Sequence, residues 1–174
     1  MYELEIPDGV EVKAEARSIS VKGKLGSTSK TINTRLFTVK AEGKKIAIEP
    51  VKNKKLEKIA NLAAMAFSNN VKAAMDGVEN GIERKMKVVF AHFPMTIEIK
   101  GDKMLVKNIF GEKVARSTSI VGSTKVEVKG QDVTVRGVDP YDVGQTVANI
   151  RKMCYARGYD TRVFQDGIYQ VVER

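Results

Sequence analysis

The stretch VKAEGKKIAI, from Val39 to Ile48, alternates apolar and polar side chains on either side of a glycine. A similar stretch, VEVKGQDVTV, runs from Val126 to Val135, with Gly130 standing 87 residues after Gly43. Alternation of this kind predicts two strands that each bury one face, and a glycine between them suits a hairpin turn with positive φ. The sequence therefore predicts the same β-hairpin twice.

Three further pairs of segments match in the same order along the chain, at offsets between 85 and 88 residues. The pairs are VEVK (10–13) with IEIK (97–100), VKGKLG (21–26) with VKNIFG (106–111), and IANLAAMAF (59–67) with VANIRKMCY (147–155). Collinear matches at a nearly constant offset indicate a duplicated module with short loop insertions and do not fit a short-period solenoid.

After its strands, each copy changes to the helical spacing of apolar residues. The predicted buried face consists of Leu56, Ile59, Ala63, Phe67, Val71 and Met75 in the first helix, and of Val143, Val147, Ile150 and Cys154 in the second. The second helix also has end signals, which are Asp139 as N-cap, Pro140 at the first helical position, Asp142 at N3 and Gly158 after the last turn. One amphipathic helix per copy is therefore expected.

These patterns predict the α+β class, with two tandem homologous domains, each a mainly antiparallel sheet covered by one helix. A chain of 174 residues is long enough for two small domains. We expect the boundary near GVENG, Gly77 to Gly81, with the first α+β repeat over residues 1–80 and the second over residues 81–174.

The charge of the chain favours a polyanionic partner. Thirty Lys and Arg against 21 Asp and Glu give a formal net charge of +9. Basic residues gather in two places, between residues 21 and 45 and between Arg151 and Arg162. Phosphate binding produces such clusters, although solvated lysines on the exposed face of a strand produce a similar pattern.

The sequence gives little support for a catalytic site, a metal site or a cofactor. The single cysteine, Cys154, is best interpreted as a small core residue, and the single histidine, His92, as structural. The glycine-rich stretch VKGKLGSTSK (21–30) lacks the G-x-x-x-x-G-K-[ST] spacing of a phosphate-binding loop. No apolar run reaches the roughly 18 residues of a membrane span, and the N-terminal MYELEIPDG lacks the layout of a secretory signal. We therefore expect a cytoplasmic protein without a membrane partner.

Four segments together resemble the large-subunit ribosomal protein L-six family, in its archaeal and eukaryotic branch. They are MDGVENGIERKMKVVFAHFP (75–94), VKNIFGEK (106–113), GVDPYDVGQTVANI (137–150) and RVFQDGIY (162–169). The resemblance covers nearly the whole chain and implies two similar α+β domains and a non-enzymatic role in the large ribosomal subunit. It further implies binding to large-subunit rRNA near the sarcin–ricin loop and the base of the factor-binding stalk. Neighbouring ribosomal proteins and, transiently, translation factors would lie close by.

The resemblance also implies which residues contact rRNA, mainly in the second domain. Candidates for phosphate contact are Lys107, Lys113 and Arg116 in the motif loop, and Arg151, Lys152, Arg157 and Arg162 in and after the second helix. Tyr159, beside the last basic cluster, is a candidate for stacking on an unpaired base. Relatives often have several arginines after the motif, whereas this chain has VARSTSI with Arg116 alone. In the first copy of the loop, Lys22 and Lys24 are further candidates, although a polar surface turn needs no function.

Two other functions stay open at the level of the sequence. A small basic α+β enzyme acting on an anionic metabolite would use His92 as its base, but no nucleophile motif accompanies that histidine. A protein–protein adaptor would bind partners along the edges of the repeated sheets.

Overall fold

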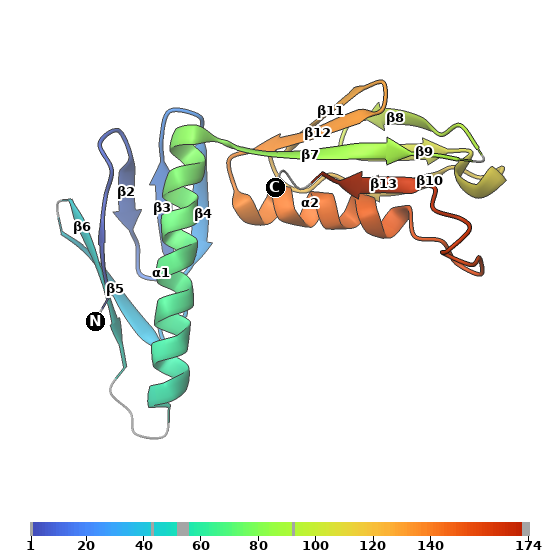
Figure 1. The fold of residues 1–174 in the computed structure, drawn as a ribbon. Coiled ribbons are helices and arrows are strands. Elements are labelled where there is room, and N and C mark those ends of the chain that lie inside the picture. Colours follow the sequence, from blue (N-terminus) through green and yellow to red (C-terminus); the bar gives the residue numbers. More distant parts are fainter. Residues whose placement is uncertain (1, 43, 52–55, 92, 172–174) are drawn as a thin grey trace. The chain divides into compact units, whose positions relative to one another are not determined.

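A computed structural model of the protein describes residues 2–42, 44–51, 56–91 and 93–171. Figure 1 shows its helices and strands, which fall into two compact units, Met1–Gly81 and Ile82–Arg174. We call them the first and the second unit. Within the described residues, neither helix combines the length and the apolar character that a bilayer crossing requires.

The first unit has two antiparallel three-stranded sheets, with strand orders β1-β6-β5 and β2-β3-β4, and helix α1 contacts both of them. Its elements are β1 (Tyr2–Glu5), β2 (Glu11–Ala14), β3 (Ser18–Lys22), β4 (Ser27–Thr31), β5 (Phe37–Glu42), β6 (Lys45–Pro50) and α1 (Glu57–Asn80). Ile46 and Ile48 occupy alternate positions along β6, on the same face of the strand, and are fully buried. The predicted half-buried hairpin of this copy is therefore present, while Gly43 lies outside the described residues.

The second unit has a four-stranded sheet of order β11-β12-β7-β13 and a three-stranded sheet of order β10-β9-β8, both antiparallel. Its elements are β7 (Ile82–Val89), β8 (Thr96–Lys100), β9 (Lys103–Lys107), the 3-10 helix η1 (Ile109–Gly111), β10 (Arg116–Ser119), β11 (Lys125–Lys129), β12 (Asp132–Gly137), α2 (Pro140–Met153) and β13 (Gly167–Gln170). Gly130 has a φ of 62° in the tight turn between β11 and β12, as the sequence predicted.

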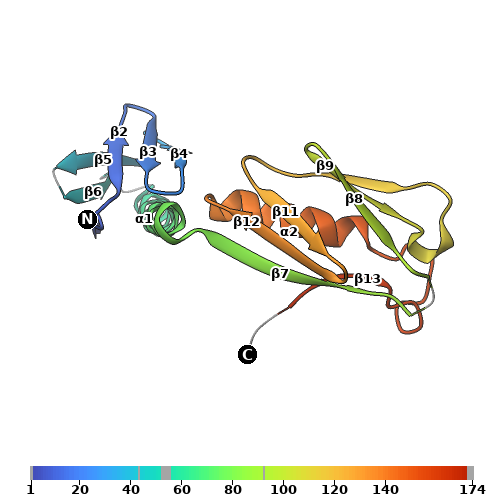
Figure 2. The same cartoon turned by 90° about the horizontal axis from the view of Figure 1, so that it is seen from above.

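The two units share one topology. The order β1-β6-β5 corresponds to β7-β12-β11, and the order β2-β3-β4 corresponds to β8-β9-β10. Figure 2 shows the second unit from above, with β13 beside β7 as a strand for which the first unit has no described counterpart. The predicted fold class, α+β with two tandem similar domains, is confirmed. Each unit divides its strands between two sheets, whereas we expected a single sheet.

The buried face of α1 differs from the prediction in its first two turns. Phe67, Val71 and Met75 are buried as expected, but Leu56 and Ile59 are 38% and 55% exposed. The fully buried positions there are Ala60 and Ala64, which lack bulky side chains and therefore let the helix backbone lie close to the strands. The buried residues of the two helices match at an offset of 83, not 88, as the pairs Ala60 with Val143, Ala64 with Val147, Phe67 with Ile150 and Val71 with Cys154 show.

Helix α2 begins as predicted and ends earlier. The Asp139 carboxylate accepts a hydrogen bond of 2.9 Å from the Tyr141 amide, and Pro140 occupies the first turn. The helix ends at Met153, five residues before Gly158, which has a φ of 78° in the loop beyond. At this point the carbonyls of Met153 and Tyr155 accept hydrogen bonds from the Arg116 side chain, which satisfies groups that have no partner within the helix.

Candidate nucleic-acid interface

The loop after β9 adopts an unusual backbone conformation. Asn108 and Phe110 have φ values of 60° and 52°, in the left-handed region that side chains other than glycine rarely occupy. The side-chain Nδ2 of Asn108 donates to the Pro94 carbonyl at 3.1 Å. Ile109 and Phe110 are both buried. Burial of two large side chains offsets the cost of the strained backbone, so this loop has a defined shape in the fold.

Arg116 clamps that loop to the end of α2. Its Nε and Nη2 donate to the Glu112 carboxylate at 2.8 and 2.5 Å, and its Nη1 donates to the carbonyls of Met153 and Tyr155 at 2.9 Å each. The paired charges raise the pKa of Arg116 and lower that of Glu112, in both cases mainly through their shared hydrogen bonds. Since a guanidinium has five N–H groups, Arg116 has little hydrogen-bonding capacity left for a phosphate.

Three aromatic rings join the loop to the segment after α2. The rings of Phe110 and Tyr159 are stacked with centroids 5.3 Å apart, and Phe164 packs against both. The Arg116 guanidinium lies 5.6 Å from the centroid of the Phe110 ring. Tyr159, a predicted base-stacking residue, is therefore held by intramolecular stacking and is 41% exposed.

Five candidate cations lie at the end of the second unit that these contacts organise. They are Lys113 after η1, Arg151 and Lys152 in the last turn of α2, and Arg157 and Arg162 in the loop beyond it. Figures 1 and 2 both show η1 and this loop at the same end of the unit. All five side chains belong to exposed residues, and none makes an ion pair with another described residue. Their positive charge is therefore not neutralised within the described structure.

The remaining candidates lie elsewhere. Lys107 forms an ion pair with Glu98 across the β8–β9 hairpin, and this contact is the main cause of the lowered pKa of Glu98. Lys22 ends β3, and Lys24 lies in the β3–β4 turn of the first unit, which packs on the end of α1 through a hydrogen bond from the Leu25 amide to the Val78 carbonyl. These three lysines do not join the cluster at the end of α2.

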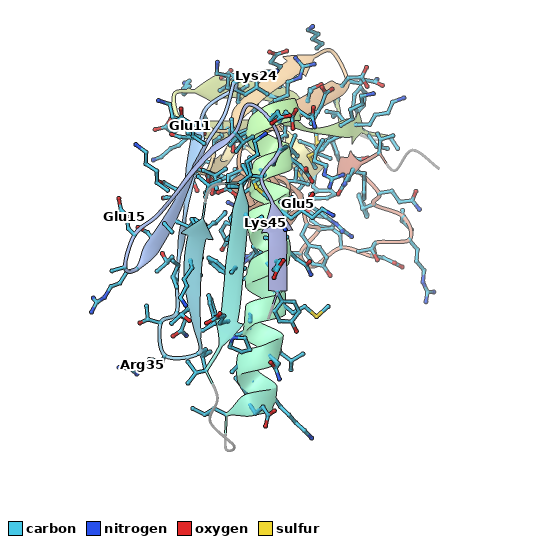
Figure 3. The ribbon with its side chains drawn as sticks, turned by 90° about the vertical axis from the view of Figure 1, so that its left-hand side faces the viewer. Glu5, Glu11, Glu15, Lys24, Arg35 and Lys45 are labelled. Atoms are coloured by element: carbon cyan, nitrogen blue, oxygen red, sulfur yellow. The ribbon has the colours of Figure 1, made fainter. Side chains whose placement is uncertain are left out.

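The basic residues between positions 21 and 45 are dispersed in the first unit. Figure 3 shows Lys24 and Arg35 at opposite ends of the unit, with Lys45 beside Glu5 between them. Lys44 forms an ion pair of 2.7 Å with Asp8, and Lys40 lies 3.6 Å from Glu49. A cluster in the sequence thus corresponds to no single positive surface here, unlike the cluster at and after the end of α2.

The sequence did not single out Tyr155 as a site residue. It matched Tyr155 with Phe67, which is buried, yet the Tyr155 side chain is 61% exposed beside the basic cluster. The only signal for it was its position between Lys152 and Arg157. An aromatic ring in that position is as typical of a core as of a surface, so the sequence alone could not separate the two.

Among the described residues, the other candidates for a catalytic or metal site do not form such a site. Burial raises the pKa of the Cys154 thiol to about 11, so the thiol is protonated and unreactive at neutral pH. His92 lies outside the described residues. Within the part of the chain that the structure describes, no three His, Cys, Asp or Glu side chains come together as metal ligands.

Known proteins similar to this chain identify its family. The sequence profile of the family described as Ribosomal protein L6 matches residues 93–167. The chain is 40% identical to the large ribosomal subunit protein uL6 of Picrophilus torridus, over 96% of this chain and 91% of that protein. Identity to the proteins of the same name is 40% in Methanothrix thermoacetophila, over 98% and 96%, and 36% in Haloarcula marismortui, over 96% and 92%. These matches confirm the predicted family, a non-enzymatic role and a place in the cytoplasmic ribosome. The chain belongs to the ribosomal protein L6 family of the large ribosomal subunit.

Proposed function

We propose that this protein binds large-subunit rRNA through the cations at the end of α2, near the sarcin–ricin loop and the base of the factor-binding stalk. Five exposed cations, none in an ion pair with a described residue, belong to the elements at that end of the second unit, and this observation carries the proposal. Their role is contact with phosphate, which orients a protein on folded RNA without reading its sequence. The second unit is then the main rRNA-binding domain.

The contribution of each predicted residue differs under this proposal. Lys113, Arg151, Lys152, Arg157 and Arg162 contact phosphates directly. Arg116 acts through the loop and the helix end that it connects, and Lys107 has to share its charge with Glu98. Lys22 and Lys24 make a separate and weaker contribution from the first unit, and Tyr159 supports the fold of the loop as much as it contacts RNA. Neighbouring ribosomal proteins and translation factors would meet other surfaces of the assembled protein.

Salt dependence tests phosphate contact. The affinity for an rRNA fragment that carries the sarcin–ricin loop is measured between low and high salt, with a fragment of equal length from another part of the rRNA as reference. Each phosphate contact contributes about −0.9 to the slope of log K against log salt on duplex RNA or DNA. The double change Arg151→Gln with Arg157→Gln should therefore reduce the steepness of the slope by about 2.

A matched control uses two lysines of the same unit that lie away from the cluster. Lys103 and Lys125 are exposed, and they begin β9 and β11. Changing both to Gln removes the same total charge and should leave the slope close to that of the parent protein. Equal losses in the two double variants would mean that total charge binds the RNA and would contradict the proposed interface. Equal affinity for the two fragments would contradict the proposed location.

A further inference from the structure

The second unit contains a hollow next to the five cations. It has a volume of about 290 Å³ and lies between the end of α2, the loop beyond it and the start of β13. Pockets for small organic molecules measure roughly 300 to 1,000 Å³. The hollow therefore suits one flat ring system better than a ligand the size of a typical drug molecule.

The walls of the hollow are fixed by contacts within the protein. Arg116 holds the carbonyl of Tyr155, a wall residue, at 2.9 Å. On the other side, the buried Asp166 carboxylate accepts a hydrogen bond of 2.6 Å from the Ala91 amide. Cys154 and Ile168, which also line the hollow, are both buried. Such a hollow is formed before any ligand arrives, which lowers the entropic cost of binding.

The side chains at its mouth have the chemistry that recognises a nucleobase. Tyr155 and Tyr169, which are 61% and 44% exposed, line the hollow together with Arg151. RNA-binding proteins take up unpaired bases by stacking them on aromatic or guanidinium planes, while cations hold the adjoining phosphates. A reactive-thiol site is excluded at neutral pH because the Cys154 thiol stays protonated.

We propose that this hollow receives one unpaired base of the bound RNA, stacked against Tyr155, with Arg151 on the phosphate next to it. The inference rests on the proposed rRNA binding and adds a specific subsite to it. Tyr155 and Tyr169 supply flat apolar surface, and Arg151 is the one cation of the cluster that also lines the hollow. The remaining cations contact phosphates outside it.

The affinity for the rRNA fragment, measured over a range of salt concentrations, distinguishes base stacking from phosphate contact. Replacement of Tyr155 by Leu keeps an apolar side chain and removes the flat ring. Loss of one stacked base should weaken binding by about 5-fold to 100-fold at every salt concentration, without a change in the salt slope. Arg151→Gln should instead reduce the steepness of the slope by about 1. The control is Tyr141→Leu, at the start of α2, where the ring is 67% exposed and does not line the hollow.

Equal affinities of the Tyr155→Leu and Tyr141→Leu variants would overturn the base subsite while leaving phosphate binding intact. So would a loss that appears only as a change of slope. Circular dichroism of each variant checks that the fold is retained, as expected for exposed side chains.

A second measurement does not depend on the rRNA complex. The full-length protein is titrated by NMR with AMP, GMP, CMP and UMP, and with ribose 5-phosphate as a ligand that has no base. We expect the amide of Ile168 and the ring of Tyr155 to shift with at least one nucleotide and not with ribose 5-phosphate. Identical shifts with ribose 5-phosphate, or no shifts with any nucleotide, would overturn the inference. This holds whether or not the protein binds the rRNA fragment, so the two proposals fail separately.

Discussion

The two units share a strand order but differ in the segment after the helix. In the first unit α1 runs for 24 residues and leads directly to Gly81. In the second unit α2 is only 14 residues long, and a basic, aromatic loop and then β13 come after it. The five cations and the hollow all belong to the second unit, at or near this addition. The repeat thus supplies a scaffold twice, and the proposed interface combines cations of the repeated loop and helix with residues of the segment that is added in the second unit.

The matching loops VKGKLG and VKNIFG show the same difference on a smaller scale. Leu25 and Phe110 occupy equivalent positions, 85 residues apart, yet Leu25 is 54% exposed and Phe110 only 5%. Phe110 is covered by Tyr159 and Phe164, which lie in the added loop. A repeated backbone therefore places equivalent side chains in different environments when the residues around them are not repeated.

The largest effect should come from removing the aromatic ring of Phe110. Phe110→Ala removes a buried aromatic side chain, which typically costs about 3–5 kcal/mol of the free energy of unfolding. Leu25→Ala, the matched change in the first unit, should cost about 0.5 kcal/mol because the side chain is largely exposed. Urea unfolding followed by tyrosine fluorescence measures the second unit, which holds four of the five tyrosines. Circular dichroism reports on the helices of both units. Similar costs at the two positions would show that the added loop does not stabilise the second unit.

An effect of intermediate size should come from removing the hydrogen bonds that Arg116 makes to Glu112 and to the end of α2, which we call the clamp. It has no counterpart in the described part of the first unit. Arg116 of β10 lies opposite Val106 of β9. In the first unit, Val21 is the equivalent of Val106, and it lies opposite Thr28. Arg116→Met leaves Glu112 and two carbonyls without their donor and should cost about 2 kcal/mol, since hydrogen bonds to charged groups contribute roughly 1.5–3 kcal/mol. It should also lower affinity for the rRNA fragment, because the loop and the end of α2 are then no longer held together.

The control for the clamp is another arginine–glutamate pair of the same unit. Arg136 donates to Glu83 at 3.0 Å, but its side chain is 55% exposed. Arg136→Met should therefore cost much less than Arg116→Met, because exposed ion pairs contribute little to stability. If the two substitutions cost the same, the hydrogen bonds from Arg116 to the end of α2 contribute nothing measurable. Partial recovery in the double variant Glu112→Gln with Arg116→Met would identify the unpaired carboxylate as the source of the loss.

The sequence predicted those features that depend on local pattern and missed those that depend on the tertiary partner. Alternation alone places Val133 and Val135 inside, and Asp139 caps its helix through neighbouring backbone atoms. The face of α1 could not be found in this way, because Ile59 is as apolar as Val147 but is largely exposed. At the end of α2, the Met153 carbonyl accepts a hydrogen bond from Arg116, which is distant in the sequence. Candidate cations could be named from their residue types, but only the fold separates those that pair with acids from those that do not.

The smallest effect concerns acid, and it tests the same clamp without altering the arginine. The ordinary pKa of Glu112 is 4.5, and its hydrogen bonds to Arg116 lower that value in the folded protein. A carboxyl group with a lowered pKa stabilises the fold fully above its ordinary pKa, and the contribution is lost as the pH falls through the lowered value. The stability of the second unit should therefore drop below pH 4.5, and Glu112→Gln should lack this part of the drop. Urea midpoints from about pH 6 to about pH 3 measure it, with Glu127→Gln on β11 as control. A Glu112→Gln variant that tracks the parent curve throughout would show that the ion pair does not contribute to the difference between the units, and would leave the carbonyl contacts of Arg116 as the link between the loop and α2.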